Sequence, residues 1–259
     1  MTVSFPSVED IPLGDPPLDE VICQVRFPLD LRLLEEVPTQ FQNRLRDRFP
    51  ILEVERPLEL EKDAARAGAA VDFRPPVYRF FDSTRENTVS LSADFFALST
   101  KTYGSWPAFA SDLRLTHTAV KEIYGLSVAS RIGLRYVNLI GPRFAPDGAV
   151  DSLFDLLRPE LTTMFRTEVL PSPLLVMNQV RVMANLEDKF AFRYGLSHRD
   201  GTDERVVVLD FDHYAEGDIT TEGLVERCER YHETIYRAFR WCFKGVEQLS
   251  IFAPQQHGC

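Results

Sequence analysis

The sequence has no long run of apolar residues and no closely spaced pair of cysteines. A membrane-spanning helix needs about 20 consecutive apolar residues, so the sequence predicts none. Residues 1–17 also lack the basic stretch and the apolar stretch of a secretion signal, and we therefore expect a cytoplasmic protein. The four cysteines show no CxxC spacing and are interpreted as reduced, buried thiols: Cys23, Cys228, Cys242 and Cys259.

Positive charge is also scarce. The chain contains 29 Lys and Arg against 39 Asp and Glu, and its formal net charge of -10 repels a phosphate backbone unless basic residues gather on one face. Nucleic acid is therefore a disfavoured partner. Otherwise the composition, with 44% apolar and 26% charged residues, is that of an ordinary globular protein. A length of 259 residues allows one large domain or two small ones.

The common motifs of catalysis and cofactor binding are missing as well. The sequence contains no G-x-S-x-G, no G-x-x-x-x-G-K-[ST], no H-E-x-x-H and no G-x-G-x-x-G. His117, His198 and His232 have no Ser or Cys at catalytic spacing and are interpreted as surface or capping residues. Asp210 and Asp212 share one face of a predicted strand, but so sparse an acidic pattern does not predict a metal site. The sequence thus predicts no catalytic residue, no cofactor and no metal ligand, and it favours a protein that is not an enzyme.

Hydrophobic periodicity predicts an α+β fold. Between an extended leader at residues 1–17 and a C-terminal tail at 246–259, segments that alternate like strands follow segments with the four-residue step of amphipathic helices. Predicted strands cover residues 18–27, 51–61, 77–81, 88–100, 129–140, 179–184, 189–198 and 205–215. Predicted helices cover residues 31–49, 105–124, 150–165 and 221–243.

The order of these elements repeats, which favours an internal duplication. The segment TVSLSADFFA aligns with VVVLDFDHYA, so Asp94 corresponds to Asp212, and the opening strands place Arg26 over Arg135. We therefore predict two copies of a β-α-β-β-β-α unit with antiparallel sheets and with helices packed on one face. The two units should form one compact domain with a groove where they meet. They cover residues 18–128 and 129–245.

Three segments of the chain together resemble a known family. They are PLDEVICQVRF at 17–27, VSLSADFFALSTKTYGSWPAF at 89–109 and RIGLRYVNLI at 131–140. In this order they resemble a sporadically distributed family of bacterial proteins of similar length that has no established activity. The resemblance implies a bacterial cytosolic protein and transfers no catalytic residue. The scattered distribution of that family implies mobile gene neighbourhoods, and hence an accessory or antitoxin-like role in a bacterial defence system.

Arg26, Arg135, Asp94 and Asp212 form the strongest candidate constellation for a site. A strand arginine that points into the protein needs a carboxylate, because an unpaired buried guanidinium is costly. One interpretation is therefore a structural Arg–Asp ion pair in each repeat. The alternative is that the two arginines, together with Tyr136, face the groove between the repeats and bind an anionic ligand such as a nucleotide or a carboxylate.

The last predicted helix carries aromatic residues on more than one side. Tyr236 and Phe243 fall outside the stripe that should face the core, and a helix that is apolar around much of its circumference is buried on two sides. This pattern predicts a homodimer or another protein partner, with Tyr236 and Phe243 at the interface. The sequence therefore favours a non-enzymatic binding or interaction protein. A sensor or enzyme for a small anionic ligand, bound in the groove between the repeats, is the alternative.

Overall fold

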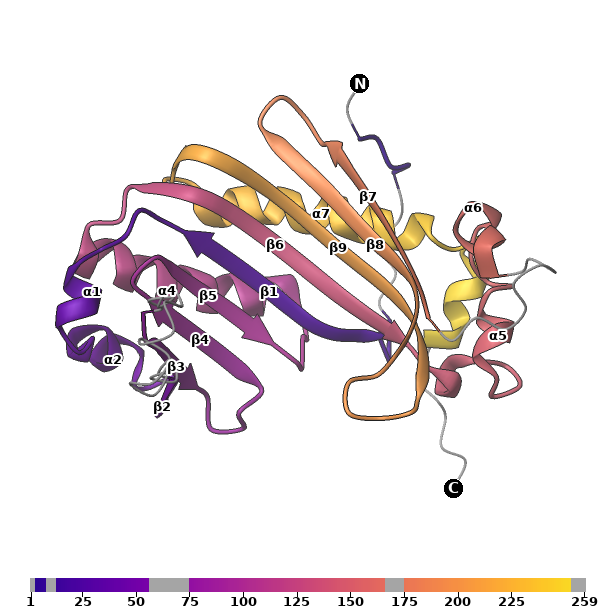
Figure 1. The fold of residues 1–259 in the computed structure, drawn as a ribbon, viewed down its shortest axis with the longest axis horizontal. Coiled ribbons are helices and arrows are strands. Elements are labelled where there is room, and N and C mark those ends of the chain that lie inside the picture. Colours follow the sequence, from indigo (N-terminus) through magenta and orange to yellow (C-terminus); the bar gives the residue numbers. More distant parts are fainter. Residues whose placement is uncertain (1–2, 8–12, 56–74, 166–174, 253–259) are drawn as a thin grey trace, which may run out of the picture. The chain divides into compact units, whose positions relative to one another are not determined.

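A large antiparallel sheet dominates the protein, whose computed structural model describes residues 3–7, 13–55, 75–165 and 175–252. The strands are β1 (Leu18–Arg26), β2 (Ile51–Glu55), β3 (Val77–Phe81), β4 (Asn87–Ser92), β5 (Phe95–Thr100), β6 (Val128–Ile140), β7 (Val176–Met183), β8 (Asp188–His198) and β9 (Arg205–Thr220). The helices are α1 (Arg32–Glu35), α2 (Thr39–Leu45), α4 (Trp106–Tyr124), α5 (Val150–Leu153), α6 (Pro159–Thr162) and α7 (Leu224–Trp241), with short 3-10 turns η1 (Pro142–Phe144), η2 (Thr163–Phe165) and η3 (Glu247–Phe252). Within the described residues the strands form one nine-stranded sheet in the order β2-β3-β4-β5-β1-β6-β9-β8-β7 (Figure 1).

The chain divides into two compact units. Unit 1 comprises Met1–Val21, Gly133–Glu216 and Glu226–Cys259, and unit 2 comprises Ile22–Ile132 and Gly217–Val225. Strands β1, β6 and β9 contribute residues to both units, because the boundaries fall within their sequences. Unit 2 contains β2 to β5 with α1, α2 and α4, while unit 1 contains β7, β8 and most of β9 with α5, α6 and most of α7. Each unit therefore combines antiparallel strands with helices.

The predicted internal duplication is wrong, because the described strands belong to one nine-stranded sheet and the two halves of the chain do not contain matching elements. Residues 88–100 are predicted as one strand, but they form β4 and β5, joined by a two-residue turn that contains Asp94. Its predicted counterpart Asp212 lies inside the long strand β9. In the described residues, four strands therefore separate α2 from α4, whereas three separate α6 from α7. The predicted groove between two repeats is therefore wrong as well, because it depended on the duplication.

Two predicted helices are interrupted by prolines. Residues 31–49 are predicted as one helix, but they form the short helices α1 and α2, and Pro38 lies at the start of the second with a ψ of 56°. Residues 150–165 divide in the same way into α5 and α6, since Arg158 before Pro159 is extended. Proline has no amide hydrogen and disfavours helical backbone in the residue before it, which explains both breaks.

Helix α4 is the longest helix in the described part of unit 2, and both of its ends are capped. The Ser105 hydroxyl accepts a hydrogen bond from the amide of Ala108 at 3.4 Å, and Gly125 ends the helix in the left-handed conformation with a φ of 70°. One face of the helix is buried through Phe109, Leu113, Thr116, Ala119 and Val120. Burial stabilises the larger of these apolar side chains by about 1.5–3 kcal/mol each, so packing rather than helix propensity holds α4 in place.

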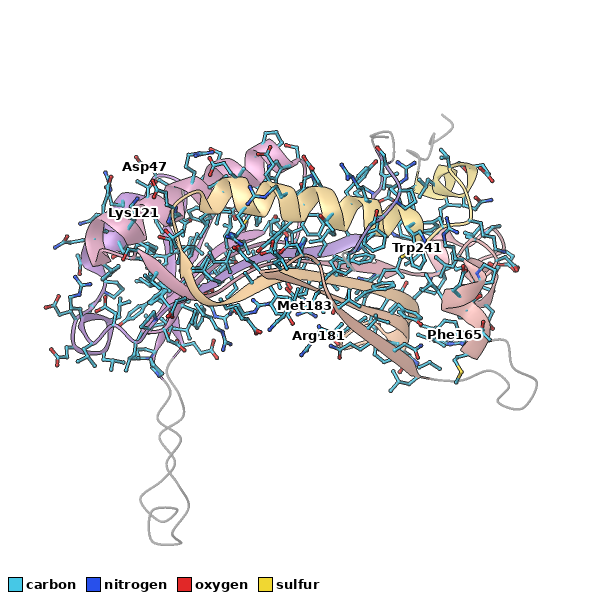
Figure 2. The ribbon with its side chains drawn as sticks, turned by 90° about the horizontal axis from the view of Figure 1, so that it is seen from above. Asp47, Lys121, Phe165, Arg181, Met183 and Trp241 are labelled. Atoms are coloured by element: carbon cyan, nitrogen blue, oxygen red, sulfur yellow. The ribbon has the colours of Figure 1, made fainter. Side chains whose placement is uncertain are left out.

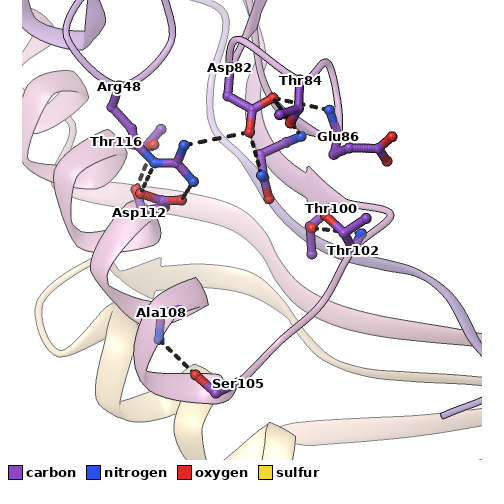
Figure 3. A network of polar contacts seen from close by, with 11 residues as sticks. Arg48, Asp82, Thr84, Glu86, Thr100, Thr102, Ser105, Ala108, Asp112 and Thr116 are labelled. Carbon is purple, nitrogen blue, oxygen red and sulfur yellow. Dashed lines mark hydrogen bonds and ion pairs between the residues drawn. The ribbon is translucent and has the colours of Figure 1, made fainter. Parts of the chain in front are cut away.

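A buried carboxylate fixes the turn between β3 and β4 in unit 2 (Figure 3). Asp82 is 4% exposed, and its carboxylate accepts hydrogen bonds from the Asn87 side chain at 2.6 Å, the Thr84 hydroxyl at 3.0 Å and the Glu86 amide at 3.0 Å. Burial by itself would raise the pKa of Asp82, but these hydrogen bonds outweigh it and lower the pKa below its usual value. The carboxylate therefore replaces water for several polar groups of the turn.

Replacement of Asp82 by alanine is expected to lower the free energy of unfolding by about 2–3 kcal/mol, because the Asn87 side chain, the Thr84 hydroxyl and the Glu86 amide lose their shared acceptor at once. Urea unfolding at neutral pH measures this loss. Asp112→Ala is the matched control: Asp112 is bound by Arg48 at 2.8 and 3.0 Å, but that arginine is 42% exposed, and we expect a loss of about 1 kcal/mol or less. Equal losses for the two variants would contradict a special role of Asp82.

Helix α7 covers one face of β8 and β9 in unit 1. Its Tyr231 stacks on His213 of β9 with ring centroids 4.1 Å apart, and the His213 ring meets the edge of Phe190 of β8. Beyond the end of the helix, Phe243 packs on Phe252 of η3 with a centroid distance of 5.6 Å. Like every other helix in the described part of the chain, α7 is not both long and apolar enough to cross a membrane.

Candidate functional site

An arginine–aspartate cluster lies on the face of the unit 1 sheet opposite to α7. Arg135 of β6 binds Asp210 of β9 through two parallel hydrogen bonds of 2.8 Å, and Arg193 of β8 binds the same carboxylate at 2.9 Å. Arg193 and Asp210 are direct cross-strand partners. The Asp210 side chain is 5% exposed, whereas those of Arg135 and Arg193 are 40% and 33% exposed. Two partly exposed guanidinium groups thus share one buried carboxylate.

The charged groups of this cluster bind one another. The hydrogen bonds to Asp210 raise the pKa of Arg135, against the opposing effect of burial, so the guanidinium stays charged at any physiological pH. Both oxygens of Asp210 are already bound by arginine. Bidentate pairing of this kind satisfies a buried carboxylate and fixes neighbouring strands in register.

The structure pairs Arg135 with a different aspartate from the predicted one. Asp212 lies two residues further along β9 on the same side of the strand, opposite Ala191 of β8. Its negative charge still favours the charged form of Arg135 and thereby contributes to the raised pKa. The register of the strands, rather than the identity of the residues, therefore decides which carboxylate the arginine binds.

The other predicted pair, Arg26 and Asp94, lies in unit 2. The Arg26 side chain binds the Gln24 side chain at 3.3 Å, while Asp94 meets the end of β1 through its main chain, whose carbonyl accepts from the Phe27 amide at 2.9 Å. Between these described residues the structure shows no ion pair. The candidate residues Arg135 and Asp212, in contrast, belong to unit 1.

Tyr136, the remaining ligand-binding candidate, points to the opposite face of β6 from Arg135, as successive strand residues must. Its hydroxyl shares a hydrogen bond of 2.8 Å with Nδ1 of His232 on α7. Tyr136 and Arg135 therefore cannot bind one small ligand from the same side of the sheet. Within unit 1 the tyrosine instead connects the sheet to the helix.

The two predicted interface residues have partners within the chain. Phe243 is 2% exposed and packs between Phe239 and Phe252, at centroid distances of 5.2 and 5.6 Å. The Tyr236 hydroxyl accepts a hydrogen bond of 2.8 Å from Arg240 on the next turn of α7. The second apolar side of α7 thus needs no other chain to bury Phe243, because η3 covers it.

The edge strand β7 and its two ends carry most of the exposed large apolar residues in the described part of unit 1. Met177 and Val180 are 47% and 46% exposed, although they lie on opposite faces of the strand. Arg181 and Met183 lie on the side of the sheet away from α7 (Figure 2). Exposed apolar residues of β7 and its two ends are Leu175, Met177, Val180, Val182, Met183 and Leu186. Such a cluster on an edge strand is typical of a binding surface.

The position of β7 is fixed at both of its ends. At Gly195 of β8, a Cβ atom would lie 1.9 Å from the carbonyl oxygen of Val176, so glycine permits the close approach of the two strands. At the other end, Asp188 accepts hydrogen bonds from Asn185 at 2.5 Å, from the Tyr231 hydroxyl at 2.6 Å and from Arg227 at 2.8 Å. These hydrogen bonds connect the β7–β8 turn to α7 and thereby fix the position of β7 relative to the helix.

The main chain of β7 has a free side. The Ala184 amide donates to the Asp188 carbonyl at 2.7 Å, and residues of an antiparallel strand alternate between facing their neighbour and facing away from it. Even-numbered residues of β7 therefore bond to β8, while the amides and carbonyls of the odd-numbered residues point outward. Among the described residues no strand other than β8 pairs with β7. The outward groups belong to Met177, Gln179, Arg181 and Met183.

Sequence reasoning missed this edge. It predicts a strand near residues 179–184 but assigns no role to it. The available signal was the segment VMNQVRVM, which has apolar residues in both alternating positions, Arg181 as its single charge and no proline. A strand that is apolar on both faces is read as an interior strand unless its place in the sheet is known.

A small pocket of about 300 Å³ is present in unit 2, between the start of α1 and the end of α4. Asp30 is the single charged residue that lines it, and Arg32 holds this carboxylate at 3.0 and 2.6 Å. Burial raises the pKa of Tyr124, which also lines the pocket, to about 12, so the hydroxyl stays neutral at physiological pH. The carboxylate of Asp30 is thus engaged by Arg32, and the Tyr124 hydroxyl keeps its proton.

No protein-family model matches the sequence, and a comparison with curated proteins finds no match. Among the residues that the structure describes, no group of three or more His, Cys, Asp or Glu side chains could hold a metal ion. The function must therefore be argued from the geometry of this chain.

Proposed function

We propose that this chain is a non-catalytic binding protein that takes up a protein partner along the free edge of β7. The observation that carries the proposal is the combination of outward main-chain groups with exposed apolar side chains on this one strand. A strand that adds to such an edge gains main-chain hydrogen bonds for affinity and side-chain contacts for specificity.

The opposite edge of the sheet shows what a protected edge looks like in the same molecule. On β2, Glu53 and Glu55 carry charge along the strand and pair with Arg85 and Arg79, each at 2.6 Å. Charged side chains on an edge oppose pairing with another chain. Strand β7 has only Arg181 as a charge, so it lacks the protection that β2 has. The contrast favours a strand that is kept free for a partner.

The anionic-ligand alternative has less support. Arg135 and Arg193, the two arginines of the cluster on the sheet face of unit 1, both direct their guanidinium groups to Asp210, at 2.8 and 2.9 Å. An anion would have to compete with a buried carboxylate that is already in place. The arginine cluster is better explained as the structural support of the strands next to β7.

We also propose that binding takes place in the cytoplasm of a bacterium. Cys23, Cys228 and Cys242 are buried and show no disulfide within the described part of the chain, which is the usual state of cysteine in a reducing compartment. The family resemblance in three segments of the sequence supports the same location and would make the partner a component of a mobile bacterial defence system.

Site-specific photo-crosslinking tests the proposal. A photoreactive amino acid at Met177 of the full chain, introduced in cells that make the protein, should form adducts with a protein identifiable by mass spectrometry. The same amino acid at Val54 on β2, which is 42% exposed, is the matched control and should not form those adducts. A Val180→Lys substitution should abolish the adducts at Met177 without changing the far-ultraviolet circular dichroism spectrum. Identical adducts at both edges, or none at Met177, would reject binding through β7.

A further inference from the structure

The geometry of β7 restricts how it can pair with a second β7. In an antiparallel pair related by a two-fold axis, the outward odd-numbered residues of one strand must meet the odd-numbered residues of the other. Three central registers satisfy this condition, and they place Gln179, Val180 or Arg181 on the axis. The side chains opposite each other differ among the three, so the sequence of β7 discriminates between them.

One of these three registers avoids unfavourable pairs of opposed side chains, and the other two do not. With Arg181 on the axis, two guanidinium groups would lie directly opposite each other, and like charges in this position are destabilising. With Gln179 on the axis, Arg181 would lie opposite the partner subunit's Met177. With Val180 on the axis, Arg181 lies opposite the partner subunit's Gln179, whose amide oxygen can accept from it, and Met177 lies opposite the partner subunit's Met183.

We propose that the partner of the β7 edge is a second copy of this chain, paired antiparallel with Val180 on the two-fold axis. The proposal rests on the proposed function, because it names the protein that the edge binds. Each strand offers four outward residues, which together form about eight main-chain hydrogen bonds between the copies. The exposed Val180 side chains of the two copies cover each other on the sheet face that carries α7. On the opposite face, Met177 of each copy covers the partner subunit's Met183.

Self-complementarity is what selects a second copy over an unrelated strand. A two-fold interface uses the same surface on both sides, so every residue must tolerate its own counterpart across the axis. Strand β7 meets this condition in charge as well as in polarity, since its single charge faces a neutral amide and its apolar residues face each other. A strand carrying several charges of one sign, as the acidic β2 does, could not pair with itself in this way.

Disulfide trapping at Val180 tests the register. Even-numbered residues do not bond across the free edge, and the Cα atoms of such opposed residues lie about 4.5 Å apart, within the range that a disulfide spans. In a Cys259→Ser background, Val180→Cys should therefore cross-link to a dimer on mild oxidation. Val182→Cys is the matched control: it lies opposite the partner subunit's Asn178, four residues or about 13 Å from its own counterpart, and should cross-link about tenfold less.

Sedimentation of the purified chain at micromolar concentration separates this inference from the proposed function. The wild-type chain should sediment as a dimer, and Val180→Lys should sediment as a monomer with an unchanged far-ultraviolet circular dichroism spectrum; its melting temperature should be lower and independent of protein concentration. A monomeric wild-type chain, or equal cross-linking of Val180→Cys and Val182→Cys, would overturn the pairing of two copies. The broader proposal would then survive only if the photoreactive residue at Met177 captured a different, identified protein.

Discussion

Replacing Asp210 by alanine should lower the free energy of unfolding by about 2–3 kcal/mol, because two partly exposed arginines lose their shared charged acceptor. The Asp210 side chain is 5% exposed and receives three hydrogen bonds from two arginines. Without it, Arg135 and Arg193 lose their shared acceptor and face each other as like charges on one side of the sheet. Urea unfolding at neutral pH, followed by far-ultraviolet circular dichroism, measures the loss.

Arg135→Ala is the matched control for this experiment. After this substitution Asp210 still binds Arg193 at 2.9 Å, and the removed side chain was 40% exposed, so we expect a loss of about 1 kcal/mol. The prediction is thus an asymmetry: the shared carboxylate matters more than either guanidinium. Equal losses for Asp210→Ala and Arg135→Ala would show that the carboxylate is not shared in solution.

The same cluster shows how far the sequence could lead. The need of a strand arginine for a carboxylate could be predicted from physical chemistry, and Arg135 does bind an aspartate of β9. Alternation along β9 also places Asp210 and Asp212 on one face. The alternation of side chains along one strand does not reveal its pairing register with a strand that is far away in the sequence. The choice of Asp210 over Asp212 follows from that register and was therefore not predictable from the residues alone.

The predicted duplication failed because a tight turn was read as part of a strand. The buried apolar residues of β4, Val89 and Leu91, have odd numbers, whereas those of β5, Phe96 and Leu98, have even numbers. A change of parity of this kind marks a turn, since one strand keeps its buried face at every second residue. That signal was available in the sequence, and it would have removed the alignment of Asp94 with Asp212.

The β7 edge could not have been found in this way. A segment that is apolar in both alternating positions suits the middle of a sheet as well as its border. Its exposure follows from the strand order, in which β7 comes last and β8 is its neighbour. Strand order depends on contacts between distant segments, such as the hydrogen bonds that Asp188 accepts from α7. The local sequence predicted the strand, but only the strand order of the fold shows that it lies exposed at the edge of the sheet.

Replacing His213 by phenylalanine should remove a large part of the pH dependence of stability between pH 6.5 and pH 4. His213 is 4% exposed, and neither ring nitrogen reaches a hydrogen-bond partner among the described residues. Burial lowers its pKa from 6.5 to about 4; the carboxylate of Asp188 raises the pKa and the guanidinium of Arg227 lowers it further, but both effects are smaller. The ring is therefore neutral in the folded protein at pH 5, where the unfolded chain carries a proton on it.

The direction of the effect follows from proton linkage. Because the unfolded state binds a proton that the folded state does not, the wild-type chain loses stability as the pH falls from about 6.5 to about 4, by about 3 kcal/mol in total. Below pH 4 this contribution is constant. Asp188, whose pKa is lowered from 3.8, stabilises the fold above that value and loses its contribution only as the pH falls further. The two groups therefore act in separate pH ranges.

Urea unfolding of the wild-type chain and of His213→Phe at pH 7, 5.5 and 4.5 measures the contribution of His213. Phenylalanine keeps an aromatic ring between Tyr231 and Phe190, so the two proteins should have similar stability at pH 7 and diverge in favour of the variant as the pH falls. The difference between them cancels the titration of the remaining histidines. Parallel curves from pH 7 to pH 4.5 would mean that the buried ring takes up a proton as readily as it does in the unfolded chain, because α7 then opens far enough to hydrate it.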